Sequence, residues 1–324
     1  MKKYASLLLF ALLLNGCDDG DLTVETFDFS EVAPSSCDDT FQLLYKIKNQ
    51  ESLLLQLPEE TFVNEVTAVG DPVILNIDTD HKLFYRTYDG AVLKANICDA
   101  IRPATPNVTD EWNATSGQIE ISTTVNYTVN ETENSTRISG YTHNIAFKNL
   151  TYSKPSGEQV GPNFVFGTIV TPAVGLNLDF KEAAEQCSTS KQVYNYSTGN
   201  GTSLTIDNID SNLIVNEVTA PNSPRTALIT STTNKVAYKV YEGVLTSSYF
   251  CNTTTPTSPA VAQIWNGENG VAGESGIIEV VTATLGPNIF THTITLKNVI
   301  LNNGNVNFKL GNSFLLGIIT VNTN

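Results

Sequence analysis

The clearest pattern along this chain is a strict alternation of apolar and polar residues, which is typical of β-strands. In the segment 119–129, the positions on one face are Ile119, Ile121, Thr123, Val125, Tyr127 and Val129. The residues between them are polar. Because successive side chains of a strand point to opposite faces, this alternation predicts one buried face and one face in contact with water. Such one-sided burial favours an antiparallel sheet.

Shorter segments with the same period predict further strands. We expect strands over residues 62–67, 82–88, 91–97, 138–149 and 164–170, separated by turn-forming Gly, Pro, Asn and Asp residues. Tyr88-Asp89-Gly90 and Tyr241-Glu242-Gly243 predict tight hairpins. Only the segment from Phe180 to Gln186 indicates a helical turn or two. The sequence therefore predicts an all-β protein.

The chain also repeats itself at an offset of about 150 residues, the usual size of a domain. Asn64-Glu65-Val66-Thr67-Ala68 returns as Asn216-Glu217-Val218-Thr219-Ala220. Further matched pairs are Cys37 and Cys187, Cys98 and Cys251, Trp112 and Trp265, His143 and His292, Lys148 and Lys297, and Gly167 and Gly317. We expect two tandem homologous domains, residues 22–172 and 173–324. Each is predicted to be an antiparallel β-sandwich or flattened barrel of about seven to nine strands.

The first residues indicate export. Lys2 and Lys3 precede a continuous apolar run from Ala5 to Leu14, which is too short to span a bilayer and is typical of a signal peptide over residues 1–16. Leu14-Asn15-Gly16-Cys17 resembles the lipobox of bacterial lipoproteins, although Asn15 departs from the usual small or branched residue. The acidic residues 18–21 that follow resemble the surface-export signal of Bacteroidota lipoproteins.

This resemblance covers some 20 residues and implies an address, with no activity attached. It implies lipidation of Cys17, an acidic spacer over residues 17–21, and attachment to the outer membrane at the cell surface. Several acyl chains on one cysteine hold a protein stably on a membrane. The alternatives are an ordinary secretory signal with a chance cysteine, and a spacer that is merely solvated.

The other four of the five cysteines fall into matching places of the two repeats. Pairing within each repeat gives the disulfides Cys37–Cys98 and Cys187–Cys251, which an oxidising location permits. A bridge between repeats would have required both copies to change partners after duplication. A metal site is the weaker alternative because the chain has no C-x-x-C pair and His81 has no counterpart in the second repeat.

The charge balance excludes one class of partner. With 33 acidic and 18 basic residues, the formal net charge of −15 opposes binding to nucleic acids and to anionic membrane surfaces. We expect no cofactor and no metal. Asp78-Thr79-Asp80 and the pair Asp207 and Asp210 could supply oxygens to calcium, but neither forms a complete binding loop, and Asx turns are the simpler interpretation.

Histidines and carboxylates that recur in both repeats are the candidates for catalysis. His143 and His292 alternate with apolar residues, which favours packed histidines that bond to neighbouring groups. Glu65 and Glu217 lie between apolar residues in the repeated block. No ordered motif marks a nucleophile. These four residues are the first candidates for the alternative function, a secreted hydrolase acting on polysaccharide or peptide.

Trp112 and Trp265 follow loops rich in Pro and Thr, and each has two interpretations. An exposed indole at the edge of a sandwich can stack on a sugar ring. A buried indole can fill the core near the disulfide, as in immunoglobulin-type sandwiches. We expect a non-enzymatic binding or structural module of the cell envelope, with glycan or an envelope protein as partner and the two tryptophans as possible ligand contacts.

Overall fold

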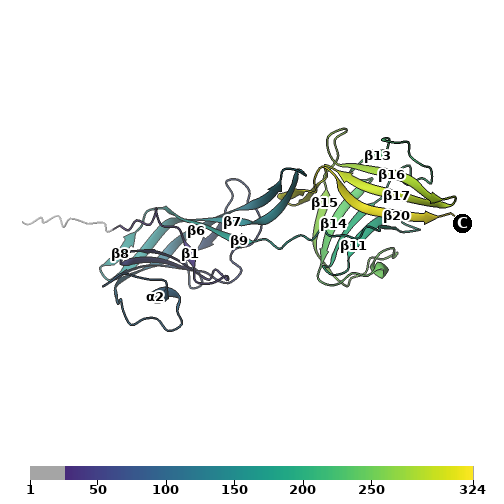
Figure 1. Ribbon diagram of the computed structural model, residues 1–324. Helices are drawn as coiled ribbons and strands as arrows, with labels where there is room; N and C mark the ends of the chain where they lie inside the picture. The colour runs from purple at the N-terminus through teal and green to yellow at the C-terminus, as the bar shows by residue number, and fades with distance from the viewer. Residues whose placement is uncertain (1–25, 324) are drawn as a thin grey trace, which may run out of the picture. The chain divides into compact units, whose positions relative to one another are not determined.

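The computed structural model describes residues 26–323, and within them the predicted all-β class is confirmed (Figure 1). The predicted signal peptide, the lipidation of Cys17 and the acidic spacer lie outside the described residues. The described chain divides into two compact units. One contains residues 26–58, Asn76–Ile119 and Phe147–Phe166, and the other contains Glu59–Leu75, Glu120–Ala146 and residues 167–323. These units do not coincide with the sequence repeats, because the first repeat contributes residues to both.

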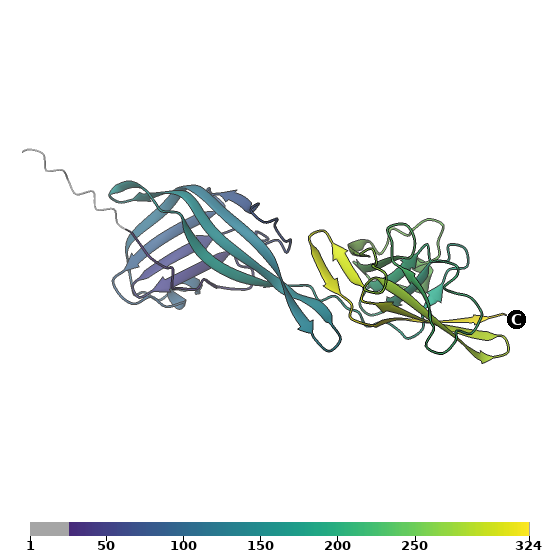
Figure 2. The same ribbon diagram turned by 90° about the horizontal axis from the view of Figure 1, so that it is seen from above.

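Within its described residues, the first repeat contains nine strands and one short helix. They are β1 (Ser35–Ser36), β2 (Leu43–Lys48), β3 (Glu51–Gln56), β4 (Val73–Asn76), β5 (Lys82–Tyr88), α2 (Ala95–Cys98), β6 (Val108–Asn130), β7 (Ser135–Lys154), β8 (Gly157–Val160) and β9 (Phe164–Pro172). The sheet order is β1-β2-β3-β5-β6-β7-β8, with β4 paired to β6 and β9 paired to β7. The long strands β6 and β7 are visible in teal in Figure 2.

The second repeat uses the same order of elements but forms two separate sheets. The larger contains β10 (Glu185–Gln186), β11 (Val193–Ser197), β12 (Thr202–Asp207), β14 (Lys235–Tyr241), β15 (Val261–Gly267), β18 (Ile300–Asn303) and β19 (Val306–Lys309). The smaller contains β13 (Arg225–Leu228), β16 (Ile277–Gly286), β17 (Ile289–Lys297) and β20 (Phe314–Asn322). The short 3-10 helix η1 (Ser247–Tyr249) stands in the place of α2.

Residues with positive φ mark the places where strands change sheet in the second repeat. Asn298 (φ 50°) separates β17 of the small sheet from β18 of the large one, and Gly276 (φ 64°) ends the segment between β15 and β16. The matching residues in the first repeat, Gly117 (φ 133°) and Asn149 (φ 54°), lie inside the continuous strands β6 and β7. A Cβ added at Gly117 would lie 2.7 Å from Leu150 Cδ2, so the bend there requires glycine. The boundary between the compact units cuts both strands within three residues of these positions.

The core of the second repeat lies between its two sheets. Tyr238, Trp265 and Phe308 of the large sheet pack in one cluster with residues of the small sheet such as Val280 and Leu296. All five are 4% exposed or less. The domain is therefore a β-sandwich, as predicted.

The opposite face of the large sheet carries a second apolar cluster beside the disulfide. It contains Cys187, Tyr194, Tyr196, Tyr241, Leu245, Tyr249 and Phe250. The predicted pairing is confirmed: Cys187 bonds to Cys251, and Cys37 bonds to Cys98, where Tyr45, Leu54 and Tyr88 form an equivalent cluster. In each repeat the disulfide ties the long loop between two central strands to the start of the sheet.

Lysines hold the segment that precedes β1. Lys46 is 3% exposed, and its Nζ donates to the carbonyl oxygen of Phe29 at 2.9 Å. Lys48 Nζ donates to the carbonyl oxygen of Asp28 at 2.6 Å. The ring of Phe27 stacks on Tyr85 with centroids 4.8 Å apart. Burial lowers the pKa of Lys46. The hydrogen bond to Phe29 and the ring of Phe166 beneath the ammonium group offset the cost of burying its charge.

Several local predictions were wrong. Residues 62–67 form no strand, and residues 91–97 form a loop that leads into α2, because this segment crosses the sheet to bring Cys98 to Cys37. The helix predicted from Phe180 to Gln186 is extended and ends in β10. The predicted hairpin at Asp89 opens a long loop, which Asp89 and Asn107 close by hydrogen bonds between their backbones and side chains.

We predict that the double substitution Cys187→Ala and Cys251→Ala lowers the free energy of unfolding of the second repeat by up to about 4 kcal/mol. The reason is that the bridge closes a loop with a sequence separation of 64, which restricts the unfolded chain. Urea unfolding followed by the fluorescence of Trp265, in a Trp112→Phe background, measures the change. An unchanged urea midpoint would contradict it.

Candidate binding site

Both tryptophans lie in the core. Trp112 and Trp265 are each 4% exposed. The indole of Trp112 packs edge-on against Tyr85 with centroids 4.8 Å apart, and its Nε1 donates to Asp110 Oδ2 at 2.9 Å. Trp265 packs against Phe308 at 5.2 Å, on the face of the sheet opposite the disulfide cluster. The structure thus favours the core interpretation, although not beside the disulfide as expected.

The burial of these rings removes the basis for a stacking platform. Trp265 also lines a cleft together with Gln263 and Asn305, but a side chain that is 4% exposed offers no open face to a sugar ring. Any ligand contacts must therefore come from other residues.

His143 and His292 are both fully buried in matching polar networks. His143 Nδ1 lies 2.9 Å from Thr123 Oγ1, and its Nε2 lies 2.9 Å from Thr171 Oγ1. Thr171 Oγ1 donates in turn to Asn64 Oδ1 at 2.6 Å. Because that hydroxyl donates its only hydrogen to Asn64, it must accept from Nε2 of the histidine. The neutral imidazole therefore has its hydrogen on Nε2.

The second repeat has an equivalent network without the intervening threonine, because its histidine contacts the asparagine directly. His292 Nδ1 lies 2.9 Å from Thr282 Oγ1, and its Nε2 lies 3.1 Å from Asn216 Oδ1, an acceptor. Burial lowers the pKa of His292, and burial lowers that of His143 to about 4. These histidines stay neutral at ordinary pH and have a structural role in these networks.

These networks account for the repeated block of sequence. Asn64 and Asn216 each join the network of their buried histidine. Thr67 and Thr219, three residues later, each bond to the backbone of the threonine that contacts that histidine. Glu65 and Glu217, between them, are exposed. The residues shared by the two copies of this block are thus those that form the hydrogen-bond network around the buried histidine.

The four candidate residues for a hydrolase are not assembled into one site. Glu217 Oε2 lies 4.0 Å from Arg225 Nη2, with 80% of its side chain exposed. The buried histidines bond to threonine hydroxyls and amides and to no carboxylate in residues 26–323. Asp78 accepts from the backbone of Asp80 and His81, which confirms an Asx turn there. No cluster that could hold a metal ion occurs among the described residues.

A cleft beside each disulfide is the feature that sequence reasoning missed. In the second repeat, a cleft of about 340 Å³ lies between the outer face of the large sheet and the loop that carries Cys251. Its lining includes Gln192, Thr205, Asp207, Lys235, Lys239, Tyr241, Tyr249 and Asn252. In the first repeat, a cleft of about 690 Å³ lies beside Cys37 and Cys98, lined also by Gln42, Leu43, Gln56 and Arg102. The two clefts occupy equivalent places.

The registers of the strands support that equivalence. In the first repeat, Leu43 pairs with Gln56 on the neighbouring strand. In the second repeat, Gln192 and Asp207 hold the matching positions, and the Gln192 amide donates to the Asp207 carboxylate. Gln56 then pairs with Lys82, as Asp207 pairs with Lys235. The duplication therefore preserved the position of the cleft and changed its side chains.

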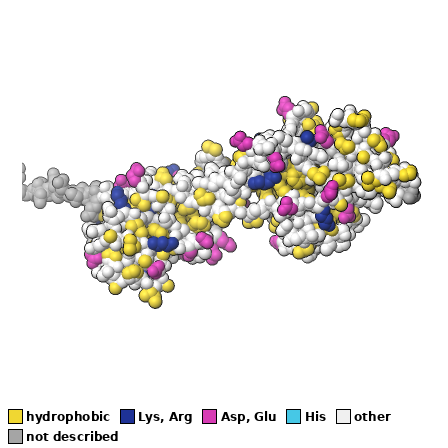
Figure 3. Space-filling view, viewed as in Figure 1, with side chains coloured by type: hydrophobic (Ala, Val, Ile, Leu, Met, Phe, Trp, Pro, Cys, Tyr) yellow, Lys and Arg dark blue, Asp and Glu magenta, His cyan; other side chains and the backbone are white. Residues whose placement is uncertain are grey.

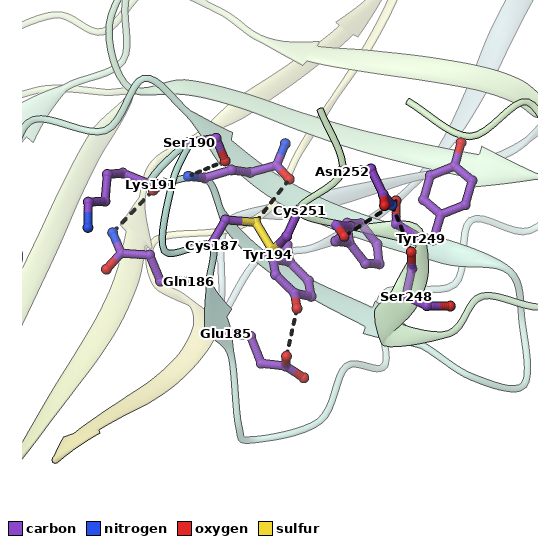
Figure 4. Close-up of a disulfide and its surroundings, with 12 residues drawn as sticks. Glu185, Gln186, Cys187, Ser190, Lys191, Tyr194, Ser248, Tyr249, Cys251 and Asn252 are labelled. Atoms are coloured by element: carbon purple, nitrogen blue, oxygen red, sulfur yellow. Dashed lines mark hydrogen bonds between the residues drawn. A yellow bond between two sulfur atoms is a disulfide. The ribbon is translucent and has the colours of Figure 1, made fainter. Parts of the chain in front are cut away.

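Aromatic rings and hydrogen bonds pack around the disulfide beside the second cleft. Figure 4 shows the disulfide with Tyr194 on one side and the turn of η1 on the other. Tyr194 stacks on Phe250 with centroids 4.2 Å apart, and its hydroxyl donates to Glu185 at 2.6 Å. Asn252 Nδ2 donates to the carbonyl oxygen of Ser248 at 2.7 Å, which closes the turn. The spacing of the cysteines signalled the loop, but only the folded chain shows the space beneath it.

Comparison of the chain with protein-family models, with curated proteins and with solved structures found no match. Within residues 26–323, no helix has the length and apolar character needed to cross a membrane.

We predict that the free energy of unfolding falls as the pH drops from 6.5 to 4, in part through His143. Because the pKa of His143 is lowered from 6.5 to about 4 in the folded state, only the unfolded chain takes up its proton in this range. This contribution amounts to about 3 kcal/mol. Urea titrations at several pH values measure the slope, and the substitution His143→Gln should flatten it. Parallel pH profiles of wild type and variant would contradict the assignment.

We also predict that Trp265→Ala destabilises the second repeat by about 3–5 kcal/mol, because it leaves a large cavity in the core. Thermal unfolding measures the change, and Trp265→Phe should recover part of it. A loss below about 1 kcal/mol would show that the ring is not a core element.

Proposed function

We propose that this protein is a lipid-anchored, non-enzymatic binding protein of the bacterial cell surface, and that each repeat binds a saccharide in the cleft beside its disulfide. The observation that carries the proposal is the recurrence of that cleft at the same place in both copies. Two copies on one chain raise the apparent affinity for a polymer when both engage it.

The chemistry of the clefts supports a saccharide ligand. Sugars present many hydroxyl groups, which pair with amides and hydroxyls, and they present apolar ring faces, which pack on aromatic side chains. Gln192 and Asn252 supply amide groups at the second cleft, and the nearly buried rings of Tyr241 and Tyr249 form its floor rather than an open stacking face. Its volume of about 340 Å³ is at the lower end of the usual range for small-ligand sites.

The proposed location at the cell surface is based on the N-terminal sequence, with support from the disulfides. The resemblance of Leu14 to Cys17 to a lipobox and the acidic residues after it support surface attachment. Two disulfides support an oxidising environment. Acidic side chains spread over the face shown in Figure 3 accord with a protein that does not bind anionic surfaces broadly.

We predict that filling either cleft weakens binding to a polysaccharide by tenfold or more, because a divalent contact becomes monovalent. Gln56→Trp fills the first cleft and Thr255→Trp the second; both side chains line their cleft and belong to exposed residues. A glycan array followed by titration calorimetry, on the mature chain with Cys17→Ser, measures the effect.

The matched control is Thr253→Trp, which adds the same ring to an exposed residue of the same loop. It should leave binding unchanged. Absence of binding to every glycan on the array, or equal losses for Thr253→Trp and Thr255→Trp, would refute the proposed function.

A further inference from the structure

The second cleft presents two lysines to the space beside the disulfide. Lys235 and Lys239 both lie on β14 and both line the cleft. They are four residues apart, so their side chains share one face of the strand. Among the described residues, neither forms an ion pair or a hydrogen bond through its side chain. Together they place positive charge at this cleft, in a chain whose net charge is −15.

The first repeat shows what neutralises this position. Arg86 holds the place of Lys239: it pairs with Ser52 on one side and Glu111 on the other, as Lys239 pairs with Ser203 and Ile264. Arg86 Nε donates to Glu111 Oε2 at 2.5 Å. In the first repeat the cation is therefore satisfied by its neighbour on the adjacent strand.

The second repeat lacks that partner. Ile264 stands where Glu111 stands in the first copy, and 43% of its surface is exposed. An exposed isoleucine cannot accept a hydrogen bond, so Lys239 is available to a ligand. Of the other charged groups at the cleft, Asp207 lies opposite Lys235 and accepts from Gln192. The two lysines outweigh this single carboxylate.

Two tyrosines beside the lysines form the floor of the cleft. Tyr241 lies two residues beyond Lys239 on the same face, and its hydroxyl lies 3.2 Å from Ser203 Oγ. Burial raises the pKa of Tyr241 to about 12, so this hydroxyl keeps its hydrogen at neutral pH. The ring of Tyr249 packs edge-on against Tyr241 with centroids 5.1 Å apart. The cleft thus combines positive charge with a floor of two nearly buried tyrosines.

We propose that the cleft of the second repeat selects an acidic saccharide, and that Lys239, assisted by Lys235, contacts the carboxylate of a uronic acid unit. This inference rests on the proposed function and specifies its ligand. Arg86, which holds the place of Lys239 in the first repeat, is paired with Glu111 and does not line the first cleft. Charge-assisted hydrogen bonds from an ammonium to a carboxylate are stronger than neutral ones, so the carboxylate determines the preference.

The experiment compares polygalacturonate with its carboxyl-reduced form, which keeps the polymer and removes the charge. Binding to the mature chain with Cys17→Ser is measured by titration calorimetry at low and at high salt. We expect wild type to prefer polygalacturonate by tenfold or more, with the preference reduced by salt.

Four variants test the residues. Lys239→Gln should remove most of the preference, and Lys239→Arg should retain it because the charge is kept. Ile264→Glu restores the acidic partner of the first repeat and should lower binding to polygalacturonate as much as Lys239→Gln. Lys297→Gln, on β17 of the small sheet, removes the same charge away from the residues that line either cleft and should have no effect.

The outcomes separate this inference from the proposed function. Equal binding of both polymers, unchanged in Lys239→Gln, would leave a saccharide-binding protein and overturn the acidic preference. Equal losses for Lys297→Gln and Lys239→Gln would reduce the effect to net charge and also overturn it. Binding to neither polymer, with binding to neutral glycans on the array, would overturn the inference alone. No binding to any glycan would overturn both.

Discussion

The geometry of this fold depends on a few positions where the backbone must turn with positive φ. Asn298 and Gly276 stand where strands leave one sheet of the second repeat and enter the other. These crossings are needed because they bring residues of both sheets into one core. Trp265 precedes the crossing at Gly276 and Val280 follows it, and both lie in the same apolar cluster. Gly117 and Asn149 hold the same positions in the first repeat. A side chain with a branched Cβ at any of them would oppose the left-handed conformation.

A second constraint explains which parts of the two copies stayed alike. A fully buried imidazole needs partners for both nitrogens, since an unsatisfied polar group in the core is costly. Asn64 and Thr67 in one copy, and Asn216 and Thr219 in the other, belong to these networks. The cleft linings face solvent and carry no such requirement. Their side chains were therefore free to diverge while the buried polar residues were not.

The sequence predicted the class, the duplication and the disulfides because each has a local signature. Alternation identified residues 82–88, which match β5, and the matched cysteines gave the correct pairs. The same alternation wrongly predicted a strand over residues 91–97, where the apolar residues belong to a loop and short helix held by the disulfide from Cys98 to Cys37. It also could not place the tryptophans or reveal the clefts. The positions of the tryptophans and of the clefts depend on which face of a sheet is covered by a loop that is distant in the sequence. Alternation shows that two faces differ, but it does not show which of them the loop covers.

The lysines that hold the segment before β1 have a mechanical consequence. A pull on the N-terminal side of the chain acts first on residues 26–29, before it reaches any strand. To yield, this segment must break the bonds from Lys48 to Asp28 and from Lys46 to Phe29, and it must withdraw the ring of Phe27 from Tyr85. These contacts bear the load together because they lie within three consecutive residues. They resist withdrawal of this segment before any tension reaches the sheets.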